Sequence, residues 1–354
     1  MSEVKRGYVR PLDLKHGRVD MTHGSGGRAM VQLISELFAS HLGNAYLGQG
    51  NDGAVLPAPV IDGKPARLVM STDCHVVSPL FFPGGDIGCL SVHGTLNDVA
   101  VMGATPLYLA AGFILEEGFA LGDLARIVES MAHAANAAGV PVVTGDTKVV
   151  ERGKGDGIFI TTTGVGVLPD GVELGGARVR AGDAILVSGT MGDHGVAIMS
   201  QRENLSFDAV IQSDTAALHT LVSAVLATGA DVRCLRDPTR GGLASTLNEI
   251  AGQSGVGMML HEKAIPIKPV VAAACEFLGL DPLYVANEGK LIVICAGADA
   301  PRVLAAMRAH SQGSDAAIIG EVIADDHHFV QLTTAFGGRR IVDWLAGEQL
   351  PRIC

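Results

Sequence analysis

The second half of the chain alternates short apolar runs with longer segments in which apolar residues recur every three or four positions. Short apolar runs between turn residues are typical of buried strands, whereas the longer period is typical of helices. We expect strands at 184–188, 232–235, 256–260, 291–295 and 317–323, and helices at 218–227, from 241 onward, at 270–278 and at 301–310. Elements that alternate in this way can bury their apolar faces in a layered α/β domain.

The first half contains the same two kinds of segment. We expect strands at 67–72, 106–115, 140–143 and 158–167, and helices at 87–102 and 121–138. Asp86 is a good N-cap for the first helix, and Gly103 and Gly139 are typical helix ends. The pattern breaks after residue 167, which predicts a domain boundary near residue 172. The chain is therefore divided into an N-terminal arm (1–22), an N-terminal domain (23–171), a C-terminal α/β domain (172–346) and a tail (347–354).

Composition argues against several classes of function. The formal net charge is −11 and no basic stripe is present, which argues against nucleic-acid binding. The start of the chain lacks the apolar core of a signal peptide, and no apolar run is long enough to span a membrane. We expect a cytoplasmic protein whose six cysteines, none in a CxxC pair, are reduced thiols.

The adjacent His327 and His328 are expected to point to opposite faces of a strand, which favours a structural role over a metal site.

The last residue of the chain is a cysteine, Cys354. A folded core gains little from a thiol at the mobile end of a chain, so reactivity is the better reason for it. Pro351 favours an extended conformation, and an arm that begins at Gly347 can reach about 25 Å. The tail could therefore carry a sulfur into a cleft. A frayed terminus that merely ends in cysteine is the equally weighted alternative at this point.

Several glycine-rich or acidic segments are candidates for a nucleotide or metal site. His23 and Gly24 begin a glycine loop before an amphipathic segment, which suits either phosphate binding or a plain turn. The GxGxxG pattern at 48–53 is followed by prolines and not by a helix, so it does not indicate a dinucleotide fold. It leaves Asp52 in an acidic turn, while Asp73 follows an expected strand.

Further candidates lie on the first expected helix and in later loops. Asp98 lies one turn after Gly94, which leaves the carboxylate open to a ligand, whereas Asn97 and Asp86 are about 16 Å apart along the helix and cannot share one ion. The Asn97–Asp98 pair could also be a satisfied polar contact. The remaining candidates follow expected strands or lie between glycines in turns: Gly145, Asp146, Lys148, Asp193, His194, Asp237 and Glu288.

Taken together, these motifs closely resemble the HypE family of hydrogenase maturation factors, within the larger aminoimidazole ribonucleotide synthetase-like (PurM-like) superfamily. The resemblance runs from about His23 to Cys354, and the terminal Pro-Arg-Ile-Cys sets this family apart from its relatives. It rests on the segments Asn51-Asp52-Gly53-Ala54, Ser71-Thr72-Asp73, Pro79-Leu80-Phe81-Phe82-Pro83-Gly84-Gly85-Asp86-Ile87-Gly88, Gly94-Thr95-Leu96-Asn97-Asp98, Gly145-Asp146-Thr147-Lys148-Val149-Val150, Arg236-Asp237-Pro238-Thr239-Arg240-Gly241-Gly242, Asn287-Glu288-Gly289-Lys290 and Pro351-Arg352-Ile353-Cys354.

The resemblance implies a two-domain PurM-like α/β fold, in which the N-terminal domain supplies strands to a homodimer and ATP binds along that interface. It implies that a carbamoyl group, loaded on Cys354 by a partner, HypF, is dehydrated with ATP to a thiocyanate. The cyanide would pass to iron on a HypC and HypD scaffold, for a nickel-iron hydrogenase.

The resemblance also assigns roles to residues. Cys354 would carry the carbamoyl group, and Lys148 and Glu288 would handle its protons. Asp52, Asp73, Asp98 and Asp237 would bind Mg²⁺. The ATP-binding set would comprise these four carboxylates and Lys148, with His23, Gly24, Asp86, Asn97, Gly145 and Asp146.

Two other functions remain open from the sequence. A kinase of the same superfamily would phosphorylate a free small molecule such as selenide, an amide or thiamine phosphate, although residues 1–50 contain no cysteine to act as the early nucleophile of selenophosphate synthesis. A non-catalytic protein would use the tail as a thiol carrier or metal-binding end. One thiolate without clustered partners makes a poor metal site.

Overall fold

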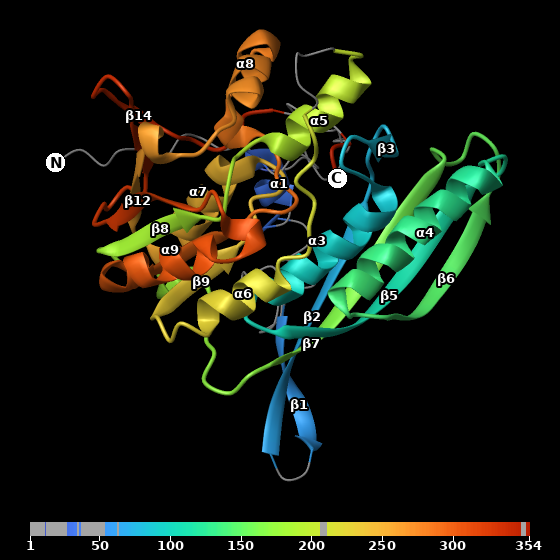
Figure 1. Cartoon of the computed structure of the whole chain (residues 1–354), viewed down its shortest axis with the longest axis horizontal. Helices are drawn as coiled ribbons and strands as arrows, with labels where there is room; N and C mark the ends of the chain where they lie inside the picture. The colour runs from blue at the N-terminus through green and yellow to red at the C-terminus, as the bar shows by residue number, and fades with distance from the viewer. Residues whose placement is uncertain are drawn as a thin grey trace.

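The computed structural model describes residues 11, 27–33, 35–36, 54–61, 64–205, 211–347 and 352–354. Almost all of the expected N-terminal arm therefore lies outside the described residues. Two sheets with their helices lie side by side, and the C-terminus lies between them (Figure 1). None of the described helices has the length and apolar character needed to cross a membrane.

The first sheet has five strands in the order β1-β2-β7-β5-β6. They are β1 (Ala54–Ile61), β2 (Lys64–His75), β5 (Thr105–Glu116), β6 (Val142–Val150) and β7 (Ile158–Leu168). Only the pair β5 and β6 is parallel. Parallel neighbours need a long crossover, which α4 (Leu121–Ala138) supplies. The β1–β2 hairpin projects beyond the rest of the sheet (Figure 1).

Helix α3 (Ile87–Val101) is the element that joins the two halves. It packs on α4, β2 and β7 of the first half and on α6 and β9 of the second. Twelve of its fifteen residues are buried, and a helix that is apolar all round is expected to be covered on every side. Asp86 caps its N-terminus by accepting hydrogen bonds from the amides of Gly88 (2.7 Å) and Cys89 (3.1 Å), which confirms the expected cap.

The second sheet has seven strands in the order β14-β13-β10-β12-β8-β11-β9. Helices cover both of its faces, because alternate residues of the central strands enter different cores. Ile185 and Val187 of β8 pack with α7, whereas Leu186 packs with α6 and α9. The strands are β8 (Asp183–Val187), β9 (Val232–Arg236), β10 (Gly257–His261), β11 (Ile292–Ala296), β12 (Ala317–Ile323), β13 (Val330–Thr333) and β14 (Arg339–Ile341).

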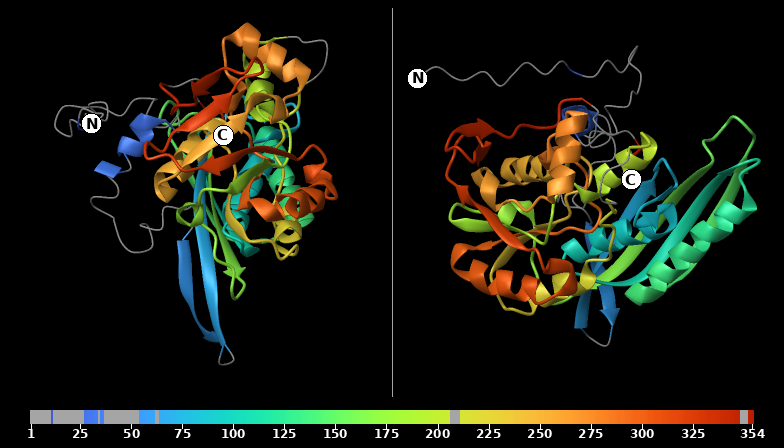
Figure 2. Two further views of the ribbon diagram at one scale, coloured as in Figure 1. Left: turned by 90° about the vertical axis from the view of Figure 1, so that its left-hand side faces the viewer. Right: turned by 45° about the horizontal axis from the view of Figure 1, so that its top comes forward.

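The helices of the second half are α5 (Asp193–Arg202), α6 (His219–Leu226), α7 (Gly242–Ser254), α8 (Pro269–Leu278) and α9 (Ala300–Arg308). Shorter elements are α1 (Arg28–Leu33), β3 (Phe81–Phe82), β4 (Gly85–Asp86) and five 3₁₀ turns, η4 (Gly176–Arg178), η5 (Glu262–Ala264), η6 (Pro282–Tyr284), η7 (Gly297–Asp299) and η8 (Ser311–Gly313). Figure 2 shows the second half as a layered α/β unit, which confirms the expected fold class.

Two local expectations are wrong. The expected strand 140–143 continues to Val150, so Gly145, Asp146 and Lys148 lie within β6 and not in a loop after it. Small polar residues are typical of a strand end, but here the pairing of β6 with β5 continues through them. His327 and His328 lie in the connection between β12 and β13 and not on a strand, and the ring of His327 stacks on Phe329.

Candidate functional site

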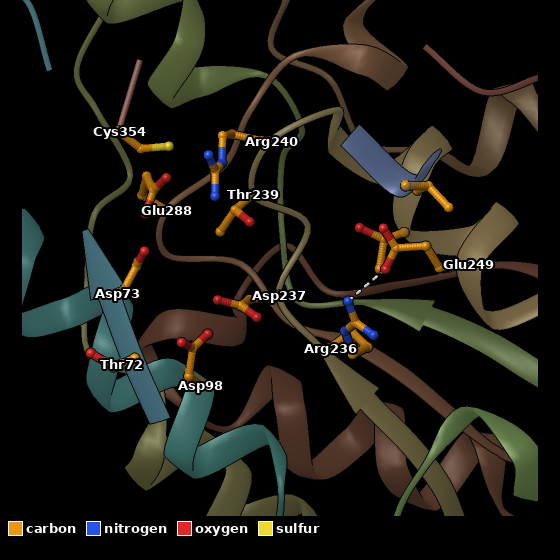
Figure 3. A pocket seen from close by; sticks show the side chains of 13 residues that line it. Thr72, Asp73, Asp98, Arg236, Asp237, Thr239, Arg240, Glu249, Glu288 and Cys354 are labelled. Atoms are coloured by element: carbon orange, nitrogen blue, oxygen red, sulfur yellow. Dashed lines mark hydrogen bonds and ion pairs between the residues drawn. The ribbon is translucent and has the colours of Figure 1, made fainter. Parts of the chain in front are cut away.

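A pocket of about 320 Å³ lies between the two halves of the molecule, and the thiol of the last residue lines it. The side chains come from β2, α3, the loop after β9, α7 and the segment before β11 (Figure 3). Pocket residues are Val31, Thr72, Asp73, Gly94, Asp98, Arg236, Asp237, Thr239, Arg240, Thr246, Glu249, Glu288 and Cys354. Five separate predictions, Asp73, Asp98, Asp237, Glu288 and Cys354, thus meet in one pocket.

Asp73 and Asp98 reach the pocket from a strand and a helix that pack together. The pleat of β2 points Asp73 inward and leaves Cys74 exposed on the other face. Gly94 permits the close approach of helix and strand, because a Cβ at this position would lie 3.3 Å from Asp73 Oδ2. Ser71 donates a 2.7 Å hydrogen bond to Asp98 Oδ2, which holds that carboxylate toward the pocket.

The loop between β9 and α7 supplies Asp237 and Arg240. It turns through Gly241 and Gly242, whose φ angles of 77° and 59° favour glycine. A Cβ on Gly242 would also lie 2.6 Å from the carbonyl oxygens of Leu283 and Val285, so only glycine allows this loop to pack against the segment before Glu288.

Glu288 is held through its main chain. Its amide donates to Asp214 Oδ1 (3.0 Å), and its carbonyl accepts from Asn97 Nδ2 (3.3 Å). The carboxyl group is buried, and this burial together with the carboxylates of Asp73 and Asp237 raises its pKa well above the usual range. Its Oε1 atom has no hydrogen-bond partner among the described residues. A buried carboxyl with an open acceptor is suited to exchange a proton with a ligand.

Cys354 lies beside Glu288 and Arg240 (Figure 3). The residue is partly exposed toward the pocket, yet burial of its thiol, with Glu288 as the next cause, raises the thiol pKa. The group is therefore a neutral thiol in this environment. The neighbouring acidic groups, first Cys354 and then Asp73 and Glu288, raise the pKa of Arg240, so its guanidinium keeps its charge.

Arg240 was not assigned a role from the sequence. It belongs to the segment 236–242, in which only Asp237 is assigned a role from the sequence, as a metal ligand. The position of Arg240 three residues after an expected metal ligand is the feature of the sequence that could have identified it as a site residue. Among the pocket cations, Arg236 forms an ion pair with Glu249 at 2.8 Å, whereas Arg240 faces the thiol (Figure 3).

The other predicted residues that the structure describes do not line this pocket. Asp86 caps α3, and Asn97 makes three main-chain hydrogen bonds: it donates to the carbonyls of Ala216 (3.0 Å) and Glu288 (3.3 Å) and accepts from Leu218 (2.8 Å). That pattern fits the satisfied polar contact left open above. Gly145, Asp146 and Lys148 lie on exposed β6, where the Lys148 ammonium contacts Asp146 Oδ2 at 2.6 Å. Asp52, His23 and Gly24 lie outside the described residues.

The pocket has the chemistry for a magnesium nucleotide. No cluster of three or more possible metal ligands occurs among the described residues, which exclude Asp52. Mg²⁺ usually takes only one or two carboxylates and completes its shell with water and phosphate oxygens. Asp73, Asp98 and Asp237 face one pocket from three elements, so this donor set fits Mg²⁺ together with a polyphosphate.

A substitution at Gly289 tests how tightly the segment that contains Glu288 is packed. A Cβ here would lie 1.8 Å from the Asp214 carbonyl oxygen, so we expect Gly289→Ala to displace one of the two segments and to lower the free energy of unfolding by about 3 kcal/mol or more. Gly252 is exposed on α7 with nothing within 4 Å, and Gly252→Ala should add about 0.5–1 kcal/mol. Urea unfolding of both variants measures the difference, and equal stability would contradict the close packing.

Comparison with known proteins agrees with this fold and pocket. Residues 50–168 match the family model for the N-terminal domain of AIR synthase related proteins, and residues 180–333 match the model for the C-terminal domain. The chain therefore belongs to the AIR synthase related proteins, the PurM-like class. A structure of thiamine monophosphate kinase from Aquifex aeolicus shares this fold at 18% identity and a TM-score of 0.65.

Within that class the chain belongs to the HypE family of carbamoyl dehydratases. It is 69% identical over 351 residues to carbamoyl dehydratase HypE of Cupriavidus necator, covering 99% of both chains. It is 47% identical to that of Escherichia coli K12, covering 95% of this chain and 99% of the relative. A crystal structure of HypE in complex with ATP aligns with a TM-score of 0.79 at 51% identity, over 94% of this chain and 99% of that one. A HypE–HypF complex aligns with a TM-score of 0.82 at 48% identity, over 88% and 99%.

Proposed function

We propose that this protein dehydrates a carbamoyl group carried on Cys354 to a thiocyanate, with ATP as the driving substrate, and so supplies the cyanide ligand of a nickel-iron hydrogenase. The observation that carries the proposal is the Cys354 thiol lying in the same pocket as Asp73, Asp98, Asp237 and Glu288. A kinase for a free small molecule has no need of its own C-terminus in the site. The position of the tail in the pocket therefore favours a reaction in which the group that accepts the phosphoryl is attached to the protein.

The chemistry needs an oxygen to be made a leaving group. The carbamoyl oxygen takes the γ-phosphoryl group of ATP, with release of ADP, and phosphate then leaves as the C≡N bond forms on sulfur. Two protons must leave the carbamoyl nitrogen. Glu288, buried beside Cys354, would accept one of these protons when it is ionised. Arg240 would stabilise the negative charge that develops near the carbamoyl carbon bonded to the Cys354 sulfur.

Asp73, Asp98 and Asp237 would hold Mg²⁺, with Asp52 as a fourth carboxylate. The bound ion would offset the repulsion between these carboxylates and the triphosphate. Asn97 would act through the Glu288 main chain, to which it donates. ATP contacts of His23, Gly24, Asp86, Gly145 and Asp146 stay predictions.

Lys148 requires a second copy of the chain. It does not line the Cys354 pocket of its own chain, and it lies on β6, an edge strand of the five-stranded sheet. Val143 and Val149 of β6 are 57% and 67% exposed. An unpaired edge with apolar side chains is suited to pair with another strand. We therefore propose a homodimer formed through this sheet, in which Lys148 enters the pocket of the partner subunit.

The tail also requires partners. The HypE–HypF complex among the related structures supports HypF as the donor of the carbamoyl group. A HypC–HypD complex in the cytoplasm is proposed as the acceptor of the cyanide, because a thiocyanate on a terminal residue must be handed to another molecule.

Mass spectrometry of the C-terminal peptide tests the reaction. Protein carbamoylated on Cys354 should lose 18 Da, the mass of one water molecule, from that peptide when ATP and Mg²⁺ are added, because carbamoyl becomes cyano. Without ATP the mass should not change. Retention of the full carbamoyl mass after incubation with both would refute the proposal. Turnover of a soluble acceptor by a chain that lacks Cys354 would favour the kinase.

A further inference from the structure

The last three residues of the chain form a short antiparallel bridge with the segment after β2. Ile353 pairs with Val77, the amide of Val76 donates to the Cys354 oxygen at 2.9 Å, and the amide of Ser78 donates to the Arg352 carbonyl at 3.0 Å. Both side chains of the bridge are buried, Val77 at 1% and Ile353 at 3% exposed. The position of the Cys354 thiol is therefore fixed by main-chain pairing of the tail with the segment after β2.

Two side chains of α5, from the other half of the molecule, bind the main chain of Arg352 and Ile353. His194 Nε2 lies 2.8 Å from the Ile353 carbonyl oxygen, which can only accept, so Nε2 carries the hydrogen. His194 Nδ1 then accepts from the Ser213 hydroxyl at 2.7 Å. His194 is fully buried, and its ring forms a T-shaped pair with the ring of Phe82, with the ring centroids 5.6 Å apart. The segment 192–195, interpreted from the sequence as a possible phosphate or metal site, thus forms the start of α5 and contacts the tail through His194.

Arg202, at the other end of α5, joins the tail to the segment with which it pairs. Its Nη2 donates to the carbonyls of Arg352 (2.9 Å) and Ser78 (2.6 Å), and its Nε donates to Ser78 at 2.9 Å. A guanidinium can bridge two carbonyls in this way because its donors form a fixed planar fork. Arg352 in turn forms an ion pair with Asp156 in the β6–β7 connection.

We propose that His194 and Arg202 form a tail clamp, a pair of positioning residues that hold the main chain of residues 352 and 353 and so keep the Cys354 sulfur in the pocket. The hydrogen bonds from the clamp to the tail end on the main-chain carbonyls of Ile353 and Arg352, and none of the clamp bonds described above involves the sulfur. The clamp can therefore hold the tail whether the sulfur is a thiol, a thiocarbamate or a thiocyanate. This last consequence rests on the proposed function.

The same geometry sets a condition for loading and delivery. A partner that modifies or unloads Cys354 outside the pocket must first break the bonds to His194, Arg202, Val76 and Ser78. Loss of the charge-assisted bonds of Arg202 should shift the balance toward the released tail by about tenfold or more. A weakened clamp should thus expose the sulfur and slow the step inside the pocket.

Alkylation of the unmodified protein tests the clamp without ATP or a carbamoyl group, so its outcome is independent of the proposed reaction. Iodoacetamide should label the exposed Cys74 quickly and Cys354 slowly, and Cys74 serves as the internal reference. In Arg202→Gln, the Cys354 rate relative to Cys74 should rise by about tenfold or more. Arg202→Lys keeps the positive charge but lacks the planar fork of donors, so its Cys354 rate relative to Cys74 should lie between those of the wild type and Arg202→Gln. Mass spectrometry of peptides produced by cleavage after glutamate measures the extent of labelling at each cysteine.

Gln201→Ala is the matched control, because Gln201 is the exposed neighbour of Arg202 on α5. It should leave the labelling ratio unchanged. His194→Leu, which removes the donor to Ile353, should raise the ratio as Arg202→Gln does, and the thermal midpoint of each variant reports whether it is folded. The clamp is refuted if Cys354 of the wild type reacts as fast as Cys74, or if folded Arg202→Gln and Arg202→Lys both keep the wild-type ratio.

Discussion

Glu288→Gln is expected to slow the ATP-dependent loss of water from carbamoylated Cys354 by about 10²–10⁴-fold, the usual contribution of a positioned acid or base. Glutamine has nearly the same shape but cannot accept a proton at neutral pH. The main-chain bonds of residue 288 to Asp214 and Asn97 do not involve the carboxyl group and should persist. The effect should therefore fall on the chemical step. Single-turnover mass spectrometry of preloaded protein measures it directly.

Glu276→Gln makes the same chemical change at an exposed position of α8 and should leave the rate unaltered. ATP binding, followed by calorimetry, should survive in Glu288→Gln. A variant that keeps more than about a tenth of the wild-type rate would remove Glu288 from the proton transfer, because general acid–base residues contribute more than that. A loss of ATP binding together with the rate would instead assign the residue to the nucleotide site.

The alternation of strands and helices was sufficient to predict most of the second half. β9, β10, β11 and β12 lie within one or two residues of their expected bounds, because each is a short apolar run between turn residues. β13 and β14 were not predicted. β14 is three residues long and fully exposed, so it carries no burial pattern that a sequence could reveal.

The candidate site was predicted in part from glycine-rich turns, which contain Asp237 and Glu288, whereas Asp73 lies on β2, Asp98 on α3 and Cys354 at the end of the chain. Asp73, Asp98, Asp237, Glu288 and Cys354 all meet in one pocket. Their meeting depends on how two domains pack, and no local pattern carries that information. The tail was expected to reach a cleft, but its binding to His194 and Arg202 could not be anticipated, because those bonds end on main-chain carbonyls that every residue has.

Lys148 poses the opposite problem. Sequence resemblance groups it with Glu288 and Cys354, yet the single chain leaves its side chain 70% exposed and paired with Asp146 on β6. An exposed ion pair of this kind contributes little stability, so it gives no structural reason for the lysine to be there. The homodimer reconciles the two observations, because an edge strand can present the lysine to a second pocket.

Complementation between two inactive variants should follow if Lys148 acts in the partner's pocket. Lys148→Ala homodimers lack the lysine in both pockets, and Cys354→Ala homodimers lack the sulfur in both. A heterodimer of the two has one pocket in which the sulfur of one subunit meets the lysine of the other. Such heterodimers, co-expressed with two affinity tags and purified on both, should recover about half of the wild-type dehydration rate, since one of two equivalent pockets is complete.

A heterodimer of wild type with Cys354→Ala provides the reference, because it also contains one complete pocket and should have the same half activity. If Lys148 acted within its own chain, the Lys148→Ala and Cys354→Ala heterodimer would contain no complete pocket and would be as inactive as either homodimer, while the reference kept its half. That result would overturn the assignment to the partner. Failure to recover any doubly tagged species would overturn the dimer itself. Recovery of activity would join the exposed β6 lysine and the clamped Cys354 sulfur in one reaction, with the dimer as the smallest unit that can carry it out.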